Sequence, residues 1–220
     1  YYTLEQRTCR DRTMAEIRTH EGDISAADVL RYRDAVAIDT ETLGLVPRRD
    51  RLCVVQLSPG DGSADVIRIA AGQTQAPNLA ALLADPGRQK IFHYGRFDIA
   101  VLFHTFNVTA TPVFCTKIAS RLTRTYTDRH GLKDNVRELL EIDISKAQQQ
   151  TDWAAEKLSQ AQLEYAASDV LHLHALRDKL TQRLIRDNRM ELAAACFAFL
   201  PTRAKLDLLG WEETDIFAHS

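Results

Sequence analysis

Two acidic side chains stand together at the end of the first strongly apolar stretch of the chain. Asp39 and Glu41 follow residues 35–38, a short run of Ala, Val and Ile that predicts a buried strand. On an extended backbone, residues two positions apart point to the same side, so both carboxylates would share one face. Burying unpaired carboxylates is costly, and bound divalent cations would remove that cost. The alternative, a surface turn that carries two acids by chance, stays open from these residues alone.

Two later segments carry side chains of the same kind. Asp98 falls in the first turn of a helix expected directly after a strand, where an acid can also complement the positive end of the helix dipole. Tyr165 and Asp169 are four residues apart on another expected helix and therefore share one of its faces. Taken singly, Asp98 favours the dipole role and Tyr165 favours a place in the core.

The segments that must position these side chains begin with strands. Apolar or alternating runs predict strands at residues 35–39, 52–57 and 65–70, after a helix over residues 26–33. Turn signals rich in Pro, Gly and Asp separate the strands and leave only short connections. Such short connections predict a three-stranded antiparallel meander.

After the meander the pattern alternates between helices and strands, and then becomes helical throughout. The expected elements are a helix at 78–84, a strand at 90–93, a helix at 97–105 and a strand at 111–115. The longest helix is expected from Ser159, which forms a capping box with Gln162, to about residue 188. This order predicts an α/β fold of the ribonuclease H-like type, in which helices flank a mixed sheet of the meander plus parallel strands, with a helical C-terminal part.

The three acidic segments, in this order, resemble the exonuclease motifs of the DEDDy superfamily of 3′→5′ exonucleases. The likeness to the ribonuclease D-like group covers about residues 35–180. It includes a K-x-x-Q-x-S/T-D-W pattern before the third motif, made by Lys146, Gln149, Thr151, Asp152 and Trp153. Within that group, the Asp-Thr-Glu-Thr-Leu-Gly sequence from residue 39, the length and the near-neutral charge look most like the nano-RNase C family.

The resemblance implies a phosphodiester hydrolase that uses two divalent cations. Its ligands would be Asp39, Glu41, Asp98 and Asp169, with Asp39 bridging the two cations, and Tyr165 would orient the attacking water. Hard oxygen ligands suit Mg²⁺ or Mn²⁺, and no cluster of Cys and His in the sequence supports zinc. The expected substrates are short oligoribonucleotides, with a preference for dinucleotides such as the linear products of cyclic dinucleotide messengers. The expected products are nucleoside 5′-monophosphates.

Further residues near the motifs are candidates for contact with the substrate. Glu41 would also accept a hydrogen bond from the terminal 3′-hydroxyl, and Thr40 and His93 would touch the terminal sugar or phosphate. For His93 a structural role is an equal alternative. Leu43 is a candidate wedge against the terminal bases, with ordinary core packing as its alternative.

The charge of the chain limits the kind of nucleic acid that it could bind. The net charge is −2, whereas proteins that follow long nucleic acids are usually strongly basic. Local basic residues beside a pocket would favour short substrates or chain ends. The densest basic stretch is residues 117–137, in which Arg129 and Lys133 are candidate phosphate contacts; its alternative is a solvated helix face. A metabolic enzyme without a polyanionic partner would also fit this charge.

Length and composition predict a single exonuclease domain over residues 14–220, with residues 1–13 as an extension outside the fold. Four widely spaced cysteines, without a C-x-x-C pair, predict reduced thiols and a cytoplasmic protein. No run of 18 or more apolar residues occurs, so no membrane span is expected.

Several alternatives stay open. An enzyme of the ribonuclease D type would trim longer 3′ ends, although the roughly 40 residues after the last motif leave no room for accessory helical domains. Single-stranded DNA stays open as a substrate because no residue can be assigned to the 2′-hydroxyl. A non-catalytic nucleic-acid-binding module would be expected to have lost an acid, and all four are present. The resemblance also implies a homo-oligomer, an octameric ring, and the apolar residues 192–200 fit either the core or a subunit interface.

Overall fold

A six-stranded mixed sheet forms the centre of the computed structural model, which describes residues 15–144 and 151–219. The strands lie in the order β1-β4-β3-β2-β5-β6. Their bounds are β1 (Glu16–Glu21), β2 (Ala35–Thr42), β3 (Leu52–Ser58), β4 (Ser63–Arg68), β5 (Gln89–Phe92) and β6 (Val113–Cys115). β2, β3 and β4 pair antiparallel, and β5 and β6 extend the sheet in parallel beside β2. The predicted meander with added parallel strands is confirmed.

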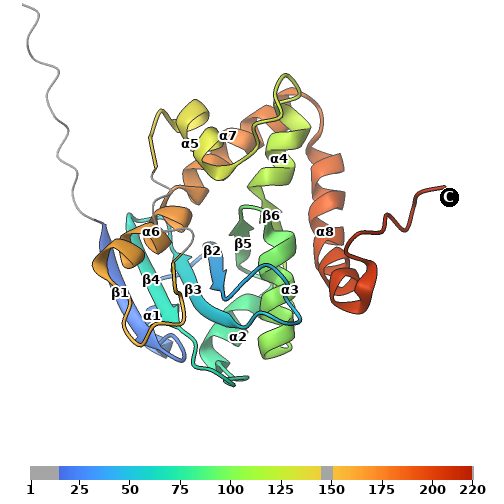
Figure 1. Cartoon of the computed structure of the whole chain (residues 1–220). Helices are drawn as coiled ribbons and strands as arrows, with labels where there is room; N and C mark the ends of the chain where they lie inside the picture. The colour runs from blue at the N-terminus through green and yellow to red at the C-terminus, as the bar shows by residue number, and fades with distance from the viewer. Residues whose placement is uncertain (1–14, 145–150, 220) are drawn as a thin grey trace, which may run out of the picture.

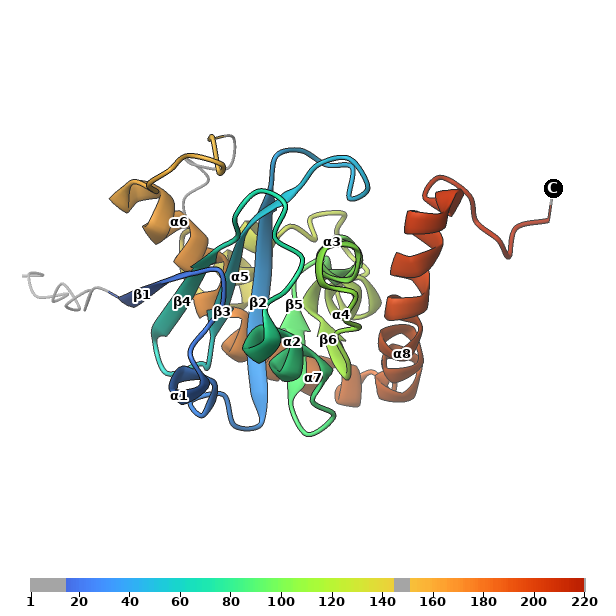
Figure 2. The same cartoon turned by 90° about the horizontal axis from the view of Figure 1, so that it is seen from below.

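Helices cover the sheet and form the C-terminal part of the chain (Figure 1). Their bounds are α1 (Ala26–Val29), α2 (Pro77–Ala84), α3 (Gly95–Phe106), α4 (Thr116–Thr123), α5 (Leu132–Leu140), α6 (Gln160–Leu171), α7 (Leu173–Arg186) and α8 (Met190–Leu206). A short π-helical segment, Asp207–Trp211, follows α8. α6 packs on β2, β3 and β4, whereas α8 packs beside α3 and β6 at the opposite end of the sheet (Figure 2). No helix in the described ranges is long and apolar enough to cross a membrane.

The centre of the sheet is closed to solvent on both faces. Every side chain of β3 is buried, although two of them, Gln56 and Ser58, are polar. The hydroxyl of Ser58 donates to the carbonyl of Ser63, at 2.7 Å. A strand that is buried on both faces needs an apolar run, and this explains why residues 52–57 carry a strong strand signal.

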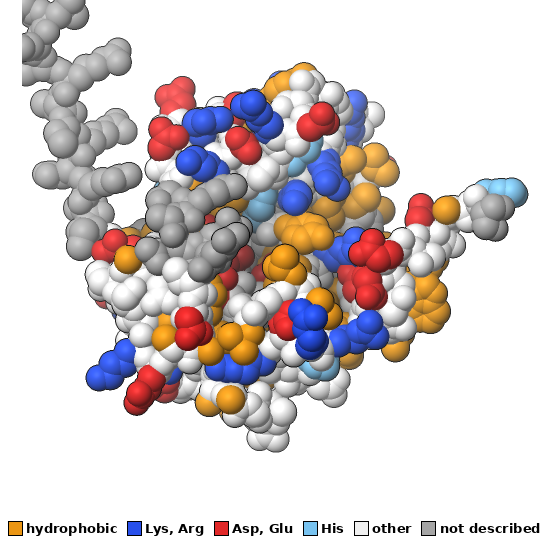
Figure 3. Space-filling model, in the orientation of Figure 1, with side chains coloured by type: hydrophobic (Ala, Val, Ile, Leu, Met, Phe, Trp, Pro, Cys, Tyr) orange, Lys and Arg blue, Asp and Glu red, His pale blue; other side chains and the backbone are white. Residues whose placement is uncertain are grey.

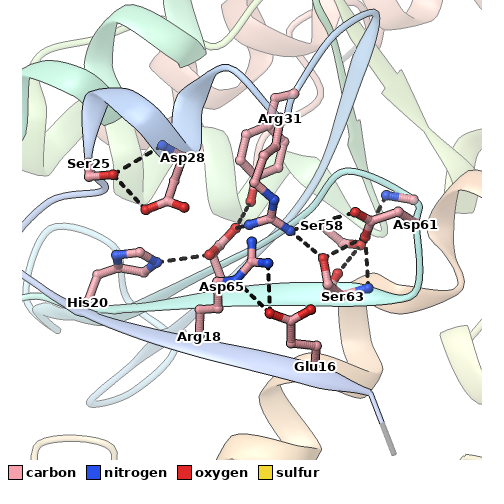
Figure 4. A network of polar contacts seen from close by, with 12 residues as sticks. Glu16, Arg18, His20, Ser25, Asp28, Arg31, Ser58, Asp61, Ser63 and Asp65 are labelled. Atoms are coloured by element: carbon pink, nitrogen blue, oxygen red, sulfur yellow. Dashed lines mark hydrogen bonds and ion pairs between the residues drawn. The ribbon is translucent and has the colours of Figure 1, made fainter. Parts of the chain in front are cut away.

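The first strand, β1, was not predicted, because its sequence is polar. It pairs in parallel with β4, and Ile17 packs against the core. A buried polar network holds the strand in place, in which the fully buried carboxylate of Asp65 binds His20 Nε2 at 2.9 Å and Arg31 Nη1 at 2.8 Å (Figure 4). The hydroxyl of Tyr32 donates to the same carboxylate. These partners lie more than 30 residues from Asp65 in the sequence, so no local sequence pattern predicts the strand.

Two predicted helices have different bounds in the structure. The helix expected over residues 26–33 ends at Val29. The long helix expected from Ser159 is two helices, because the chain turns at His172 between α6 and α7, and the longest helix is α8. The predicted capping box of Ser159 and Gln162 is present at the start of α6.

Candidate metal centre

Three of the predicted acids meet at one point of the sheet. β2 presents Asp39 and Glu41 on the face that α6 covers, and α6 presents Asp169 back toward β2. Carboxylate oxygens of the three residues lie within 4.8 Å of one another. Oxygen atoms at these separations can share a single hard cation, since Mg²⁺ binds carboxylate oxygens at about 2.0–2.1 Å.

The fourth acid, Asp98, lies beside this group in the first turn of α3. Its side chain is buried, with 4% exposed, and its Oδ1 accepts a hydrogen bond of 2.7 Å from the hydroxyl of Thr40. Thr40 is the residue of β2 between the two clustered acids, so this bond ties Asp98 to the same strand. The hydroxyl of Thr40, which was a candidate substrate contact, therefore already donates a hydrogen bond to Asp98 in this structure.

Tyr165 lies one helical turn before Asp169 on α6, close enough for the Asp169 charge to raise the pKa of its phenol. Its ring packs on Trp153, with the centroids 6.0 Å apart. Burial, followed by the negative charges of Asp169 and Glu41, raises the pKa of the phenol above its ordinary value. The hydroxyl is therefore protonated at neutral pH.

Burial and mutual repulsion raise the pKa values of the clustered acids when no cation is bound. Burial raises the pKa of Asp39 well above its ordinary value, and the charges of its three acidic neighbours raise it further. Burial and the charges of Asp169 and Asp98 raise the pKa of Glu41 to about 8. Burial raises the pKa of Asp98 to about 7, against the opposing effect of the hydrogen bond from Thr40. An all-oxygen donor set with this excess of negative charge fits a divalent cation such as Mg²⁺.

The metal-free protein is expected to lose stability as the pH rises. For Glu41, whose pKa rises from 4.5 to about 8, the folded state keeps a proton that the unfolded state loses between those values. The free energy of unfolding therefore falls across that interval. Because Mg²⁺ binds ionised carboxylates, it should raise the melting temperature more at about pH 8.5 than at about pH 5.5. Thermal melts with and without Mg²⁺ measure the difference, which Glu41→Gln should reduce; equal shifts at both pH values would contradict this arrangement.

An open cleft adjoins the acids and contains other predicted residues. Its described lining comprises Asp39, Thr40, Glu41, Thr42, Leu43, Gly44, Leu45, Phe97, Thr151, Trp153, Tyr165 and Asp169. Leu43 is 54% exposed there, so ordinary core packing is not its role. Phe97 also lines the cleft and was not predicted there, although it is the residue next to Asp98 in the sequence. Of the K-x-x-Q pattern, Lys146 and Gln149 lie outside the described residues.

The remaining candidates lie away from the described lining of the cleft. His93 follows β5 and its Nδ1 binds the hydroxyl of Thr116 at 2.8 Å, which is a structural contact. Arg129 lies exposed between α4 and α5, and Lys133 is the second residue of α5. Lys and Arg side chains lie over these helices, interspersed with Asp and Glu, at the top of the view in Figure 3.

One member of the basic stretch is unsuited to bind phosphate. Arg124 is 1% exposed, and its guanidinium is paired with Glu138 and donates to the carbonyl of Arg129 at 2.6 Å. It therefore joins α4 to α5 as a structural residue. Sequence spacing alone does not indicate this pairing, because Glu138 lies 14 residues after Arg124 in the chain.

Comparison with known proteins gives consistent matches to nucleases. The family model described as 3′-5′ exonuclease matches residues 15–185. Ribonuclease D of Gluconacetobacter diazotrophicus is 35% identical over 184 residues, which are 84% of this chain and 46% of that protein. The chain thus spans about half the length of the curated relatives it matches.

Solved structures match over nearly the whole chain. A nuclease in its apo form is 84% identical, with a TM-score of 0.93, covering 94% of this chain and 100% of the other. NrnC of Brucella melitensis with bound Mg²⁺ is 66% identical, with a TM-score of 0.89, over 93% of this chain and 100% of the other. The same protein bound to pGG is 67% identical, with a TM-score of 0.90, over 93% and 99% of the two chains.

Proposed function

The chain belongs to the 3′-5′ exonuclease family, with a domain of the ribonuclease D type, and we propose that it removes nucleotides from the 3′ ends of short RNA. The observation that carries the proposal is the convergence of Asp39, Glu41 and Asp169 within 4.8 Å, beside an open cleft. Hydrolysis of a phosphodiester needs an activated water and a means of neutralising the charge that grows on the phosphate. Bound divalent cations supply both when they lie next to the scissile group.

We assign the following roles to the residues of the centre. Asp39, Glu41 and Asp169 hold one cation, which is Mg²⁺ or Mn²⁺, and Asp39 with Asp98 holds a second. The protonated hydroxyl of Tyr165, next to Asp169, orients the attacking water. The bound Mg²⁺ of the Brucella melitensis protein supports the assignment of a divalent cation to this centre. The products of the proposed hydrolysis are nucleoside 5′-monophosphates.

The cleft supports recognition of the last two nucleotides of a chain. Leu43 is exposed at the cleft and Glu41 lines it, which supports the proposal that Leu43 separates the terminal bases and that Glu41 accepts a hydrogen bond from the 3′-hydroxyl. We propose Thr40 as a positioning group, since its hydroxyl already donates to Asp98. His93 binds Thr116 through Nδ1, while its buried Nε2 has no hydrogen-bond partner among the described residues, so we keep it as a candidate substrate contact. Arg129 and Lys133, on the basic face over α4 and α5, contact substrate phosphates. The binding of pGG by the Brucella melitensis protein supports a preference for dinucleotides. We propose the cytoplasm as the location of the enzyme, because short RNA would be turned over there.

Substrate length tests the proposal. RNAs of two to about twenty nucleotides, labelled at the 5′ end, are incubated with the enzyme and Mg²⁺, Mn²⁺ or EDTA. Dinucleotides should be hydrolysed fastest, only with a metal, and Lys133→Glu should reduce both the affinity and its dependence on salt. Equal rates at every length would indicate trimming of longer RNA, and equal rates on DNA would remove the preference for RNA. The absence of cleavage with either metal would identify a binding module instead.

A further inference from the structure

A glutamine with unusual surroundings lies in the middle of the sheet. Gln56, in β3, is fully buried, and neither its Oε1 nor its Nε2 has a hydrogen-bond partner in the part of the chain that the structure describes. A buried amide without partners is unfavourable, because it gives up its hydrogen bonds to water and gains nothing in return. A buried amide of this kind is explained if it gains a hydrogen-bond partner when the protein binds its cation.

The register of the sheet places Gln56 next to the metal centre. In the antiparallel pair of β2 and β3 it lies directly opposite Asp39, and on its other side it lies opposite Val66 of β4. Residues directly opposite each other point to the same face, with Cβ atoms about 4.5–5.5 Å apart. Val54 and Val66, on this face, pack with Ala166 of α6. The glutamine therefore lies under α6, between a metal-ligand candidate and an apolar cluster.

Among the neighbours fixed by the strand register, Asp39 offers the acceptor that best suits this amide. Val54 and Val66 are apolar, and the hydroxyl of Ser58, two residues along β3, already donates to the carbonyl of Ser63. A carboxylate has about four acceptor positions, more than the two cations assigned to Asp39 would use. A hydrogen-bond donor that binds a metal-ligating carboxylate fixes the orientation of its oxygens, and such donors are common in metal sites.

We propose that Gln56 is a positioning residue of the metal centre, whose side-chain amide donates a hydrogen bond to the Asp39 carboxylate, directly or through one buried water, when the cation is bound. This inference rests on the proposed function only for the presence of the cation. Gln56 itself touches neither the substrate nor the reacting atoms. Its contribution is to hold Asp39 in the orientation that the cation requires.

Magnesium affinity, measured without substrate, tests this role. Gln56→Met keeps the approximate volume and removes the amide. Titration calorimetry and melting temperatures measured against Mg²⁺ concentration should give a dissociation constant about 10–100-fold higher than that of the wild type. The kcat of the variant should recover at high Mg²⁺, because the bound state retains its ligands.

A matched control separates this effect from loss of packing. Leu57→Val changes the next residue of β3, which points to the opposite face, and it should lower the melting temperature while leaving the Mg²⁺ affinity unchanged within about twofold. If Gln56→Met does not fold, Gln56→Leu at a lower temperature provides the same measurement. Wild-type Mg²⁺ affinity in either Gln56 variant would overturn the inference and leave the proposed function standing. A wild-type protein that binds no Mg²⁺ would overturn both.

Discussion

Replacement of Asp39 by asparagine is expected to lower the rate of RNA hydrolysis by about 10³-fold or more at saturating Mg²⁺. The carboxyl of Asp39 lies so close to the other three acids that the charge of each one raises its pKa. An amide in its place keeps the size and removes the negative charge that a cation needs there. Since a bound cation contributes several kcal/mol to the transition state, and about 1.36 kcal/mol corresponds to a tenfold rate, a loss of this size follows.

The stability of the same variant distinguishes lost chemistry from lost folding. The metal-free Asp39→Asn protein should melt at a higher temperature than the wild type near pH 8, because one source of repulsion among buried acids is gone. Asp152→Asn is the matched control: this acid is exposed, and its Oδ1 accepts from the backbone amide of Ala154 at 2.9 Å. It should leave kcat within about twofold, as is usual for a surface substitution. Substantial hydrolysis by Asp39→Asn would refute the metal centre proposed here.

The arrangement of the sheet was largely predictable because its central strands carry local signals. β2 and β3 are apolar runs bounded by turn residues, and short connections force neighbouring strands to pair. β1 lacks such a signal. Its stability comes from pairing with β4 and from the Asp65 network, whose partners are distant in sequence. A polar strand held by long-range contacts is indistinguishable from a loop until those contacts are known.

The break between α6 and α7 illustrates a second limit. Neither Gly nor Pro occurs near His172, so the periodicity runs on without a stop signal. The two helices nevertheless pack on different partners: α6 on β2, β3 and β4, and α7 mainly on α4, α5 and β5. The turn at His172 allows both faces to be buried, and this is a property of the assembled fold.

The pairs of side chains within one strand or one helix could be predicted because their geometry is local, whereas the meeting of the separate segments was expected from the family resemblance. Spacings of two residues on a strand and four on a helix fix which side chains share a face, and this brought Asp39 and Glu41 to one side of β2. The supporting residues could not be found in this way. Thr40 acquires its role from Asp98, 58 residues later, and Gln56 from the register of two strands. Arg124 is paired with Glu138, 14 residues later, and nothing in the local sequence indicates this contact.

Replacement of Tyr165 by phenylalanine is expected to reduce kcat by about 10²–10⁴-fold while leaving KM and the Mg²⁺ affinity near their wild-type values. The ring and its contact with Trp153 are retained, so the change removes one hydroxyl and little packing. Single-turnover rates and Mg²⁺ titrations with a dinucleotide separate these quantities. Tyr126→Phe provides the matched control, because that hydroxyl is exposed and binds Glu138 away from the centre.

The pH profile of the Tyr165→Phe protein distinguishes a positioning hydroxyl from a general base. The phenol holds its proton at neutral pH, because burial and the neighbouring carboxylates raise its pKa, so its own ionisation cannot supply the base near neutrality. A limb of the rate profile near neutrality must then come from a group other than this phenol. The Tyr165→Phe profile should therefore run parallel to that of the wild type, only lower. If the variant lacked one limb of the wild-type pH–rate profile, Tyr165 would act as a titrating base, and this result would contradict the proposed role of orienting the water.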